Sequence, residues 1–252
     1  MIGEYYNIDC MELMSHYPDK HFDLAIVDPE YGVNISKNIC YGMGRKNNKY
    51  KATKYIAKKW DSSPPNKEYF KELIRVSKNQ IIFGYNYFTE ILGSSNSLIF
   101  WDKLIGDNNF SAGELIYTSF KHNLRKITIS IASESNRVSC NINIAVGNAR
   151  IHPTQKPVKL YEWLLNNYAK PNDLILDTHC GSASSLIACE NLGFKYVASE
   201  LDTDYYSESL KRLKTHLLQD KLFQPVIQKN KIDTPSMFTE VRWSREKSHC
   251  TL

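Results

Sequence analysis

Three short segments of this chain combine carboxylates, hydroxyls and small residues in patterns that could bind and transform a small molecule. The first segment, residues 28–32 (Asp-Pro-Glu-Tyr-Gly), follows an apolar stretch that ends at Val27. Ligands of open α/β sheets bind beyond the carboxyl ends of strands, so this segment would present a carboxylate and an aromatic ring to a substrate. Pro29 stiffens the segment and biases Asp28 toward an extended backbone. The alternative reading is an ordinary turn after a strand.

The second segment, residues 178–185 (Thr-His-Cys-Gly-Ser-Ala-Ser-Ser), lies between an apolar strand ending at Asp177 and a predicted helix. Small residues allow a ligand to approach the backbone, and a helix N-terminus supplies amide donors and partial positive charge. Its single glycine, Gly181, does not meet the dinucleotide fingerprint. Glu200, after the next strand, stands where an acid would bind ribose hydroxyls. The pattern indicates a nucleoside-containing cofactor, or else a plain strand-to-helix turn.

The third segment, residues 152–157 (His-Pro-Thr-Gln-Lys-Pro), precedes another predicted helix. Its two prolines would hold the Thr154 hydroxyl and the Lys156 ammonium at fixed positions, where they could bind a carboxylate. The alternative is a turn that leads into the helix. His152 has no partner at a spacing typical of metal ligands, so we interpret it as structural.

The elements that must position these segments alternate between strand and helix, which favours an α/β fold with a mostly parallel sheet. A Gly193 C-cap in the left-handed region should end the helix at 184–191. Two alternating runs within residues 121–150 indicate a small antiparallel insertion that projects from the main sheet. Strands are expected at residues 5–8, 23–27, 80–83, 97–101, 114–120, 174–177 and 196–199, and helices at 67–77, 159–168, 184–191 and 204–218.

The composition is that of an ordinary globular protein, because 42% of the 252 residues are hydrophobic and 23% are charged. The chain has neither a long apolar run nor a secretory signal, so a soluble, cytoplasmic protein without membrane contact is expected. Its six cysteines form no C-x-x-C pair, which argues against a zinc ribbon or a disulfide framework. Residues 36–60 are rich in Lys and Tyr and contain no acid, so they form either a polyanion-binding surface or a solvated loop.

Together, the three segments resemble the amino-group DNA methyltransferases that use S-adenosylmethionine, in the permuted group whose catalytic segment precedes the cofactor loop. The similarity extends from about residue 4 to residue 218 and includes residues 80–88, 101–103, 110–111 and 114. It implies a Rossmann-like class I methyltransferase fold, circularly permuted, in which Asp9 near the N-terminus lies beside Glu200 and Asp177. Double-stranded DNA is the implied partner.

The resemblance also assigns roles to individual residues. Asp28 and the Pro29 carbonyl would accept hydrogen bonds from the target amine, and Tyr31 would stack on an extruded base. Lys46, Lys49, Lys51 and Lys54 would contact DNA phosphates, and the insertion would help to read the sequence. The cofactor would be bound by residues from both ends of the chain: Asp9, Cys10, Asp28, Thr154, Lys156, Asp177, Gly181, Ser182, Ser184 and Glu200.

Glu30 departs from the family, which usually has proline at this position. The first position of the segment is often Asp in adenine-N6 enzymes and often Ser in cytosine-N4 enzymes, so Asp28 favours adenine. The alternatives are cytosine-N4 methylation and a DNA-binding relative whose catalysis is impaired by Glu30. Residues 1–220 are expected to form the catalytic domain and residues 221–252 a tail. The sequence leaves open whether the protein forms a homodimer and whether it has a restriction endonuclease partner.

Overall fold

The computed structural model describes residues 1–33, 63–105, 111–130, 151, 152 and 154–223. Its strands form one sheet in the order β1-β8-β7-β2-β3-β5-β4-β6. Every pair of neighbours in this sheet is parallel except the two pairs that β5 makes with β3 and β4. The predicted mostly parallel α/β fold is confirmed. The strands are β1 (Glu4–Tyr6), β2 (Phe22–Val27), β3 (Ser77–Phe83), β4 (Leu98–Asp102), β5 (Gly113–Thr118), β6 (Arg125–Thr128), β7 (Leu174–Asp177) and β8 (Lys195–Ser199).

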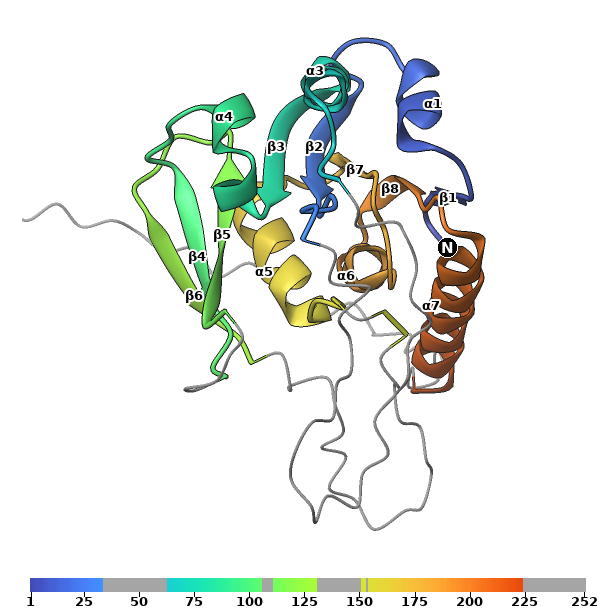
Figure 1. Ribbon diagram of the computed structural model, residues 1–252. Coiled ribbons are helices and arrows are strands. Elements are labelled where there is room, and N and C mark those ends of the chain that lie inside the picture. Colours follow the sequence, from blue (N-terminus) through green and yellow to red (C-terminus); the bar gives the residue numbers. More distant parts are fainter. Residues whose placement is uncertain (34–62, 106–110, 131–150, 153, 224–252) are drawn as a thin grey trace, which may run out of the picture.

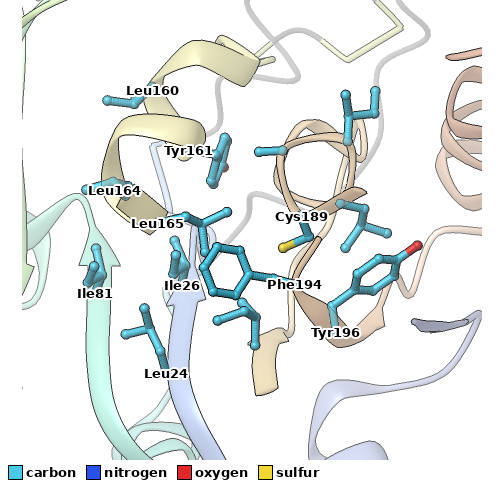
Figure 2. Packing of buried hydrophobic residues seen from close by; sticks show 14 of the residues in the cluster. Leu24, Ile26, Ile81, Leu160, Tyr161, Leu164, Leu165, Cys189, Phe194 and Tyr196 are labelled. Atoms are coloured by element: carbon cyan, nitrogen blue, oxygen red, sulfur yellow. The ribbon is translucent and has the colours of Figure 1, made fainter. Parts of the chain in front are cut away.

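Helices cover both faces of this sheet (Figure 1). On one face lie α5 (Val158–Tyr168), α6 (Ser184–Leu192) and α7 (Thr203–Phe223), and on the other α1 (Cys10–Ser15) and α3 (Lys67–Val76). Successive side chains of β2 point to opposite faces, so Leu24 and Ile26 belong to the first core and Ala25 and Val27 to the second. Figure 2 shows Leu24 and Ile26 facing the side chains of α5. Burial on both faces explains why β2 ends in the unbroken apolar run of residues 24–27.

The chain reverses its direction across the sheet between β7 and β2. From β7 the chain passes through α6 to β8, whereas from β2 it passes through α3 to β3 on the opposite face. The loops after β7 and β2 therefore diverge and leave a crevice beyond their carboxyl ends, which is where open α/β sheets bind ligands. Both of the first two sequence segments begin at this crevice.

A segment near the start of the chain and a segment near residue 200 meet at the edge of the sheet formed by β1. Strand β1 pairs in parallel with β8, with Tyr6 opposite Ser199, and the Glu200 amide donates to the Tyr6 carbonyl over 3.1 Å. The Asn7 side chain adds a hydrogen bond of 2.7 Å to the Glu200 carbonyl. Asp9 follows in the loop after β1, and Glu200 directly follows β8. The two acids therefore lie near the same ends of two neighbouring strands, as the permuted order predicts.

Local signals account for the ends of several helices. The Asn66 side chain caps α3 by accepting a 3.0 Å hydrogen bond from the Tyr69 amide. Gly193 caps the C-terminus of α6 with φ of +78°, as predicted. Helix α7 runs to Phe223, past the expected domain boundary at residue 220. None of the described helices is long and apolar enough to cross a membrane.

One expectation for the insertion at 121–150 is wrong. Its first alternating run was expected to project from the sheet, but β6 belongs to the main sheet, where it pairs in parallel with β4 and is the last strand among the described residues. The antiparallel pairing expected within the insertion involves residues 142–146, which are not described. Burial of Ile127 and a 2.8 Å hydrogen bond from Trp101 Nε1 to the Ile129 carbonyl favour this position. Residues 131–150 lie outside the described residues. The sequence also gave no signal for α1, the short 3₁₀ helix η1 (Tyr85–Tyr87) or α4 (Thr89–Leu92).

Candidate active site

A cavity of about 1010 Å³ opens beyond the carboxyl ends of β2, β7 and β8. Its lining draws together residues that lie far apart in the sequence, from the N-terminal loop to the segment after β8. Most of the predicted site residues are on its wall: Asp9, Cys10, Asp28, Pro29, Tyr31, Thr154, Lys156, Gly181, Ser182 and Glu200. The three sequence segments therefore converge on one space.

Asp177 and Ser184 are behind this wall rather than on it. Both side chains are buried. The Asp177 carboxylate accepts hydrogen bonds from the Ser185 hydroxyl over 2.5 Å and from the His179 amide over 3.0 Å. Burial raises the pKa of Asp177 to about 6 despite these bonds. These two residues support the cofactor loop from the side of the core.

The Asp28 carboxylate, directly after β2, is held from two sides. Its Oδ1 accepts a 2.6 Å hydrogen bond from the Tyr31 hydroxyl, and its Oδ2 pairs with the Lys156 ammonium. Burial raises the pKa of Asp28, and Glu114 adds to that effect, while Lys156 opposes it. Asp28 is consequently a stronger proton acceptor than a surface aspartate, with its charge balanced by a lysine from the third segment.

Glu114, on β5, is the acid that completes this cluster. Its Oε1 also lies 2.6 Å from the Tyr31 hydroxyl, whose single proton can be donated to only one of Asp28 and Glu114 at a time. Glu114 pairs with the Lys156 and Lys103 ammonium groups at 3.3 and 3.0 Å. Burial would raise the pKa of Glu114, but the two lysines outweigh burial and lower it. Two carboxylates and two ammonium groups thus balance in charge within a water-poor pocket.

The Tyr31 ring is fixed by its neighbours as well as by its hydroxyl. It stacks on Tyr87 with ring centroids 4.7 Å apart and planes inclined by 12°. A Cβ atom at Gly84, whose φ is +71°, would stand only 2.3 Å from Tyr31 Cε1, so glycine makes room for the ring. Tyr87 is 47% exposed and lines the same cavity. Aromatic surface is therefore available beside the Asp28 carboxylate.

The loop between β7 and α6 turns sharply toward the cavity. Gly181 and Ala183 both have positive φ, of 53° and 61°. The Arg212 guanidinium, from α7, donates to the Ser182 carbonyl over 2.7 Å and to the Ser184 hydroxyl over 2.9 Å. This contact ties the loop to a helix near the end of the described chain.

Glu200 connects the loop between β7 and α6 to the segment that follows β8. Its Oε2 accepts a 2.8 Å hydrogen bond from the Gly181 amide, and its Oε1 accepts one of 2.9 Å from the Asp202 amide. Burial raises the pKa of Glu200, and these two amides oppose the shift. Asp9 is exposed and uses its Oδ1 to cap α1 through the Met11 amide at 2.8 Å. Asp9, which was predicted to bind the cofactor, therefore also stabilises the N-terminus of α1.

Sequence reasoning missed several residues of this site. Glu114 and Lys103 were noticed only as part of the resemblance, and Tyr87, His179 and Arg212 were given no role. The alternation in β5 could have indicated that Glu114 is inward, but its partners lie on other segments of the chain. The predicted phosphate-binding residues Lys46, Lys49, Lys51 and Lys54 lie outside the described residues.

The sequence profile of a family described as DNA methylase, of the N6/N4 type, matches residues 38–211, which is more than half of the chain. The chain belongs to the N6/N4 DNA methylase family. The amino-group methyltransferases predicted from the sequence are this family, and their cofactor is S-adenosylmethionine. The resemblance stated from the motifs is therefore confirmed.

Individual relatives agree with this assignment. The methylase is 24% identical to type II methyltransferase M2.MboI of Moraxella bovis over 243 residues, which cover 82% of this chain and 86% of that protein. It is also 24% identical to type II methyltransferase M.HinfI of Haemophilus influenzae over 246 residues, covering 82% of this chain and 67% of that protein.

Solved structures share the fold of the methylase. One is M1.HpyAVI in complex with S-adenosylmethionine, with a TM-score of 0.53 and 18% identity over 83% of this chain and 98% of that chain. Another is the cytosine-N4-specific PvuII DNA methyltransferase, with a TM-score of 0.52 and 15% identity over 87% of this chain and 92% of that chain.

The cavity fits a nucleoside cofactor in its size and in its polar groups. Its volume of about 1010 Å³ is at the upper end for small-molecule sites. Gly181 contributes no side chain to the wall, and the carboxylate of Glu200 stands next to it, where ribose hydroxyls would be bound.

Proposed function

We propose that this methylase transfers a methyl group from S-adenosylmethionine to the exocyclic N6 amine of adenine in double-stranded DNA. The observation that carries the proposal is that the Asp28–Tyr31 segment and the Gly181–Ser182 loop line the same cavity. The choice of adenine over cytosine is supported by Asp28 at the first position of the catalytic segment.

The exocyclic amine of adenine is a weak nucleophile because its lone pair is delocalised into the ring. Accepting hydrogen bonds from its N–H groups makes the nitrogen more tetrahedral and richer in electrons. The Asp28 carboxylate and the Pro29 carbonyl are the acceptors that we assign to this task. Burial raises the pKa of Asp28, which strengthens it as an acceptor, while Lys156 opposes this shift. Bound S-adenosylmethionine supplies the electrophilic methyl group.

The residues around the loop after β7 would hold the cofactor. We assign the ribose hydroxyls to Glu200, the adenine side to Asp9 and Cys10, and the loop backbone to Gly181 and Ser182. Thr154 lines the cavity and is our candidate for the methionine end. Lys156 is engaged with Asp28 and Glu114, so we assign it to the catalytic carboxylate instead. Asp177 and Ser184, whose side chains are buried behind the cavity wall, would support this loop without contacting the cofactor.

A base within a duplex must leave the stack to reach this cavity, at a cost of a few kcal/mol. Tyr31 and Tyr87 offer aromatic surface that would stabilise the extruded base. We keep Lys46, Lys49, Lys51 and Lys54 as the proposed phosphate contacts. A restriction endonuclease that reads the same DNA sequence is a proposed partner, which the names of the type II relatives support.

The decisive experiment incubates purified protein with methyl-labelled S-adenosylmethionine and unmodified genomic DNA, and identifies the labelled nucleoside. N6-methyladenine is the expected product. N4-methylcytosine would contradict the adenine assignment, and cofactor binding without transfer would indicate the impaired relative. Asp28→Ala should abolish the label while cofactor affinity stays within a few-fold. The control Asp19→Ala changes an exposed aspartate and should retain activity.

A further inference from the structure

Glu30 and His179 form an ion pair between the two loops that meet at the cavity. Glu30 follows β2 within the catalytic segment, and His179 follows β7 within the cofactor loop. Strands β2 and β7 are parallel neighbours, with Ala25 opposite Leu176, so the two loops start next to each other before they diverge toward opposite faces of the sheet. The distance from His179 Nε2 to Glu30 Oε2 is 3.3 Å.

The pair is largely removed from water, with side-chain exposures of 16% for His179 and 27% for Glu30. Burial alone would lower the pKa of His179, but Glu30 outweighs burial and raises it well above its usual value. Burial likewise would raise the pKa of Glu30, but His179 outweighs burial and lowers it. Both groups are therefore charged at neutral pH, and the contact is an ion pair with a hydrogen bond.

A hydrogen-bonded chain extends this pair into the core. His179 Nδ1 is 2.9 Å from the Thr178 hydroxyl, which is 2.7 Å from the Tyr69 hydroxyl on α3. An imidazolium donates from both nitrogens, so Thr178 accepts on one side while Glu30 accepts on the other. The ring of His179 also meets Tyr69 edge-on, with centroids 5.1 Å apart. The orientation of the imidazolium is thus fixed from several directions.

Other titratable groups face this pair, and they affect the pKa values of His179 and Glu30 to different degrees. Cys10 at the start of α1 contributes a hydrogen bond to His179 that supports the charged imidazole. Asp177 and Glu200, at the ends of β7 and β8, each interact electrostatically with His179. His152 acts on Glu30 in the same sense as His179 does, but more weakly. Glu30 is the largest of the charged influences on His179.

We propose that Glu30 and His179 are a positioning pair that fixes the catalytic segment relative to the cofactor loop, without touching the reacting atoms. The inference rests on the proposed function, because the geometry that it fixes is that of methyl transfer. Glu30 stands where the family usually has proline, which stiffens the segment through its ring. In this chain a cross-loop ion pair supplies the restraint, and the Glu30 carboxylate is directed to His179 instead of the base.

The first test does not depend on activity. Imidazole NMR should find His179 protonated through neutral pH in the native protein and, in Glu30→Gln, deprotonating at least about one pH unit lower. Hydrogen exchange at the 179–182 amides should accelerate about tenfold in Glu30→Gln, although that substitution lies in the other loop. Glu68→Gln, an exposed glutamate on α3 paired with Lys71, is the matched control and should change neither. An unchanged His179 titration or unchanged exchange in Glu30→Gln would overturn the inference.

The second test measures steady-state methyl transfer on the folded fraction of each variant. Glu30→Gln and His179→Gln should each lower kcat about tenfold while KM for S-adenosylmethionine changes less than threefold, because misplaced loops cost rate more than binding. The double variant should be no slower than either single variant, as expected for one coupled unit. A roughly hundredfold loss in the double variant would overturn the inference. If the native protein transfers no methyl group, the proposed function fails, and titration and exchange still decide the pair.

Discussion

The Lys156 ammonium lies against the Asp28 carboxylate although 128 residues separate them in the chain. Lys156 also reaches Glu114 and lies 4.6 Å from the centroid of the Phe83 ring, so it is surrounded by acids and aromatic surface. The contact joins the third sequence segment to the first. It places a cation directly beside a buried carboxylate whose pKa is raised by burial.

Removal of this cation should be costly. In Lys156→Met the Asp28 and Glu114 carboxylates lose their shared counter-ion while they remain buried, so we expect a loss of about 3–5 kcal/mol in the free energy of unfolding. Urea denaturation measures it. Lys159→Met is the control, because Lys159 is 74% exposed and pairs with Glu162 on the surface. Equal stability of the two variants would contradict the buried cluster.

Asp177 predicts a specific dependence of stability on pH. Its pKa is about 6 in the folded protein and 3.8 for the ordinary side chain, so the folded state binds its proton more tightly. The contribution of Asp177 to the free energy of unfolding should therefore fall as the pH rises from about 3.8 to about 6, by about 3 kcal/mol in total. Urea titrations of the native protein and Asp177→Asn between pH 4 and pH 7 should diverge in this direction. Parallel curves would refute it.

Alanine substitutions at two glycines can distinguish the effect of backbone strain from the effect of displacing Tyr31. Gly84 and Gly93 both have φ of +71°, but a Cβ at Gly84 would collide with the Tyr31 ring, whereas one at Gly93 would meet nothing within 4 Å. Alanine at Gly84 should cost about 1 kcal/mol of stability from its left-handed backbone, and alanine at Gly93, whose ψ is −172°, should cost about 1–3 kcal/mol. Gly84→Ala alone should also lower methyl transfer, by at least about tenfold, in the labelled-cofactor assay. Comparable activity in both variants would show that the position of Tyr31 is unimportant.

Arg212 should influence cofactor affinity from a distance. Arg212→Met removes the donors to the Ser182 carbonyl and the Ser184 hydroxyl, so the loop after β7 loses its tie to α7. We expect the Kd for S-adenosylmethionine, measured by calorimetry, to rise about tenfold, equivalent to about 1.4 kcal/mol. Lys211→Met, which changes the exposed neighbour on α7, should bind as the native protein does. An unaltered Kd in Arg212→Met would contradict a role for this tie.

The sequence was informative wherever the signal was local. The apolar run before Asp28 predicted β2, and Gly193 predicted the end of α6. In both places the deciding residues are neighbours in the sequence. The expectation that Asp9 lies beside Glu200 came instead from the family resemblance, because no local pattern connects two residues so far apart.

The sequence was uninformative where contacts between distant residues decide the outcome. No local pattern reveals that Glu114 faces Lys156, or that His179 pairs with Glu30, because each partner is in a separate loop or strand. The place of β6 in the main sheet was missed for the same reason. An alternating run identifies a strand, but its pairing depends on the neighbour that buries Ile127.

The pairing of β1 with β8 has a consequence for how the protein is made. The ribosome releases β1 long before its hydrogen-bonding partner β8, so an unfinished chain keeps an open strand edge until β8 has emerged. Glu200 also emerges only at that late stage. A polypeptide interrupted before β8 therefore lacks one wall of the cavity and the neighbour of β1, so the site can assemble only after β8 and Glu200 have been translated.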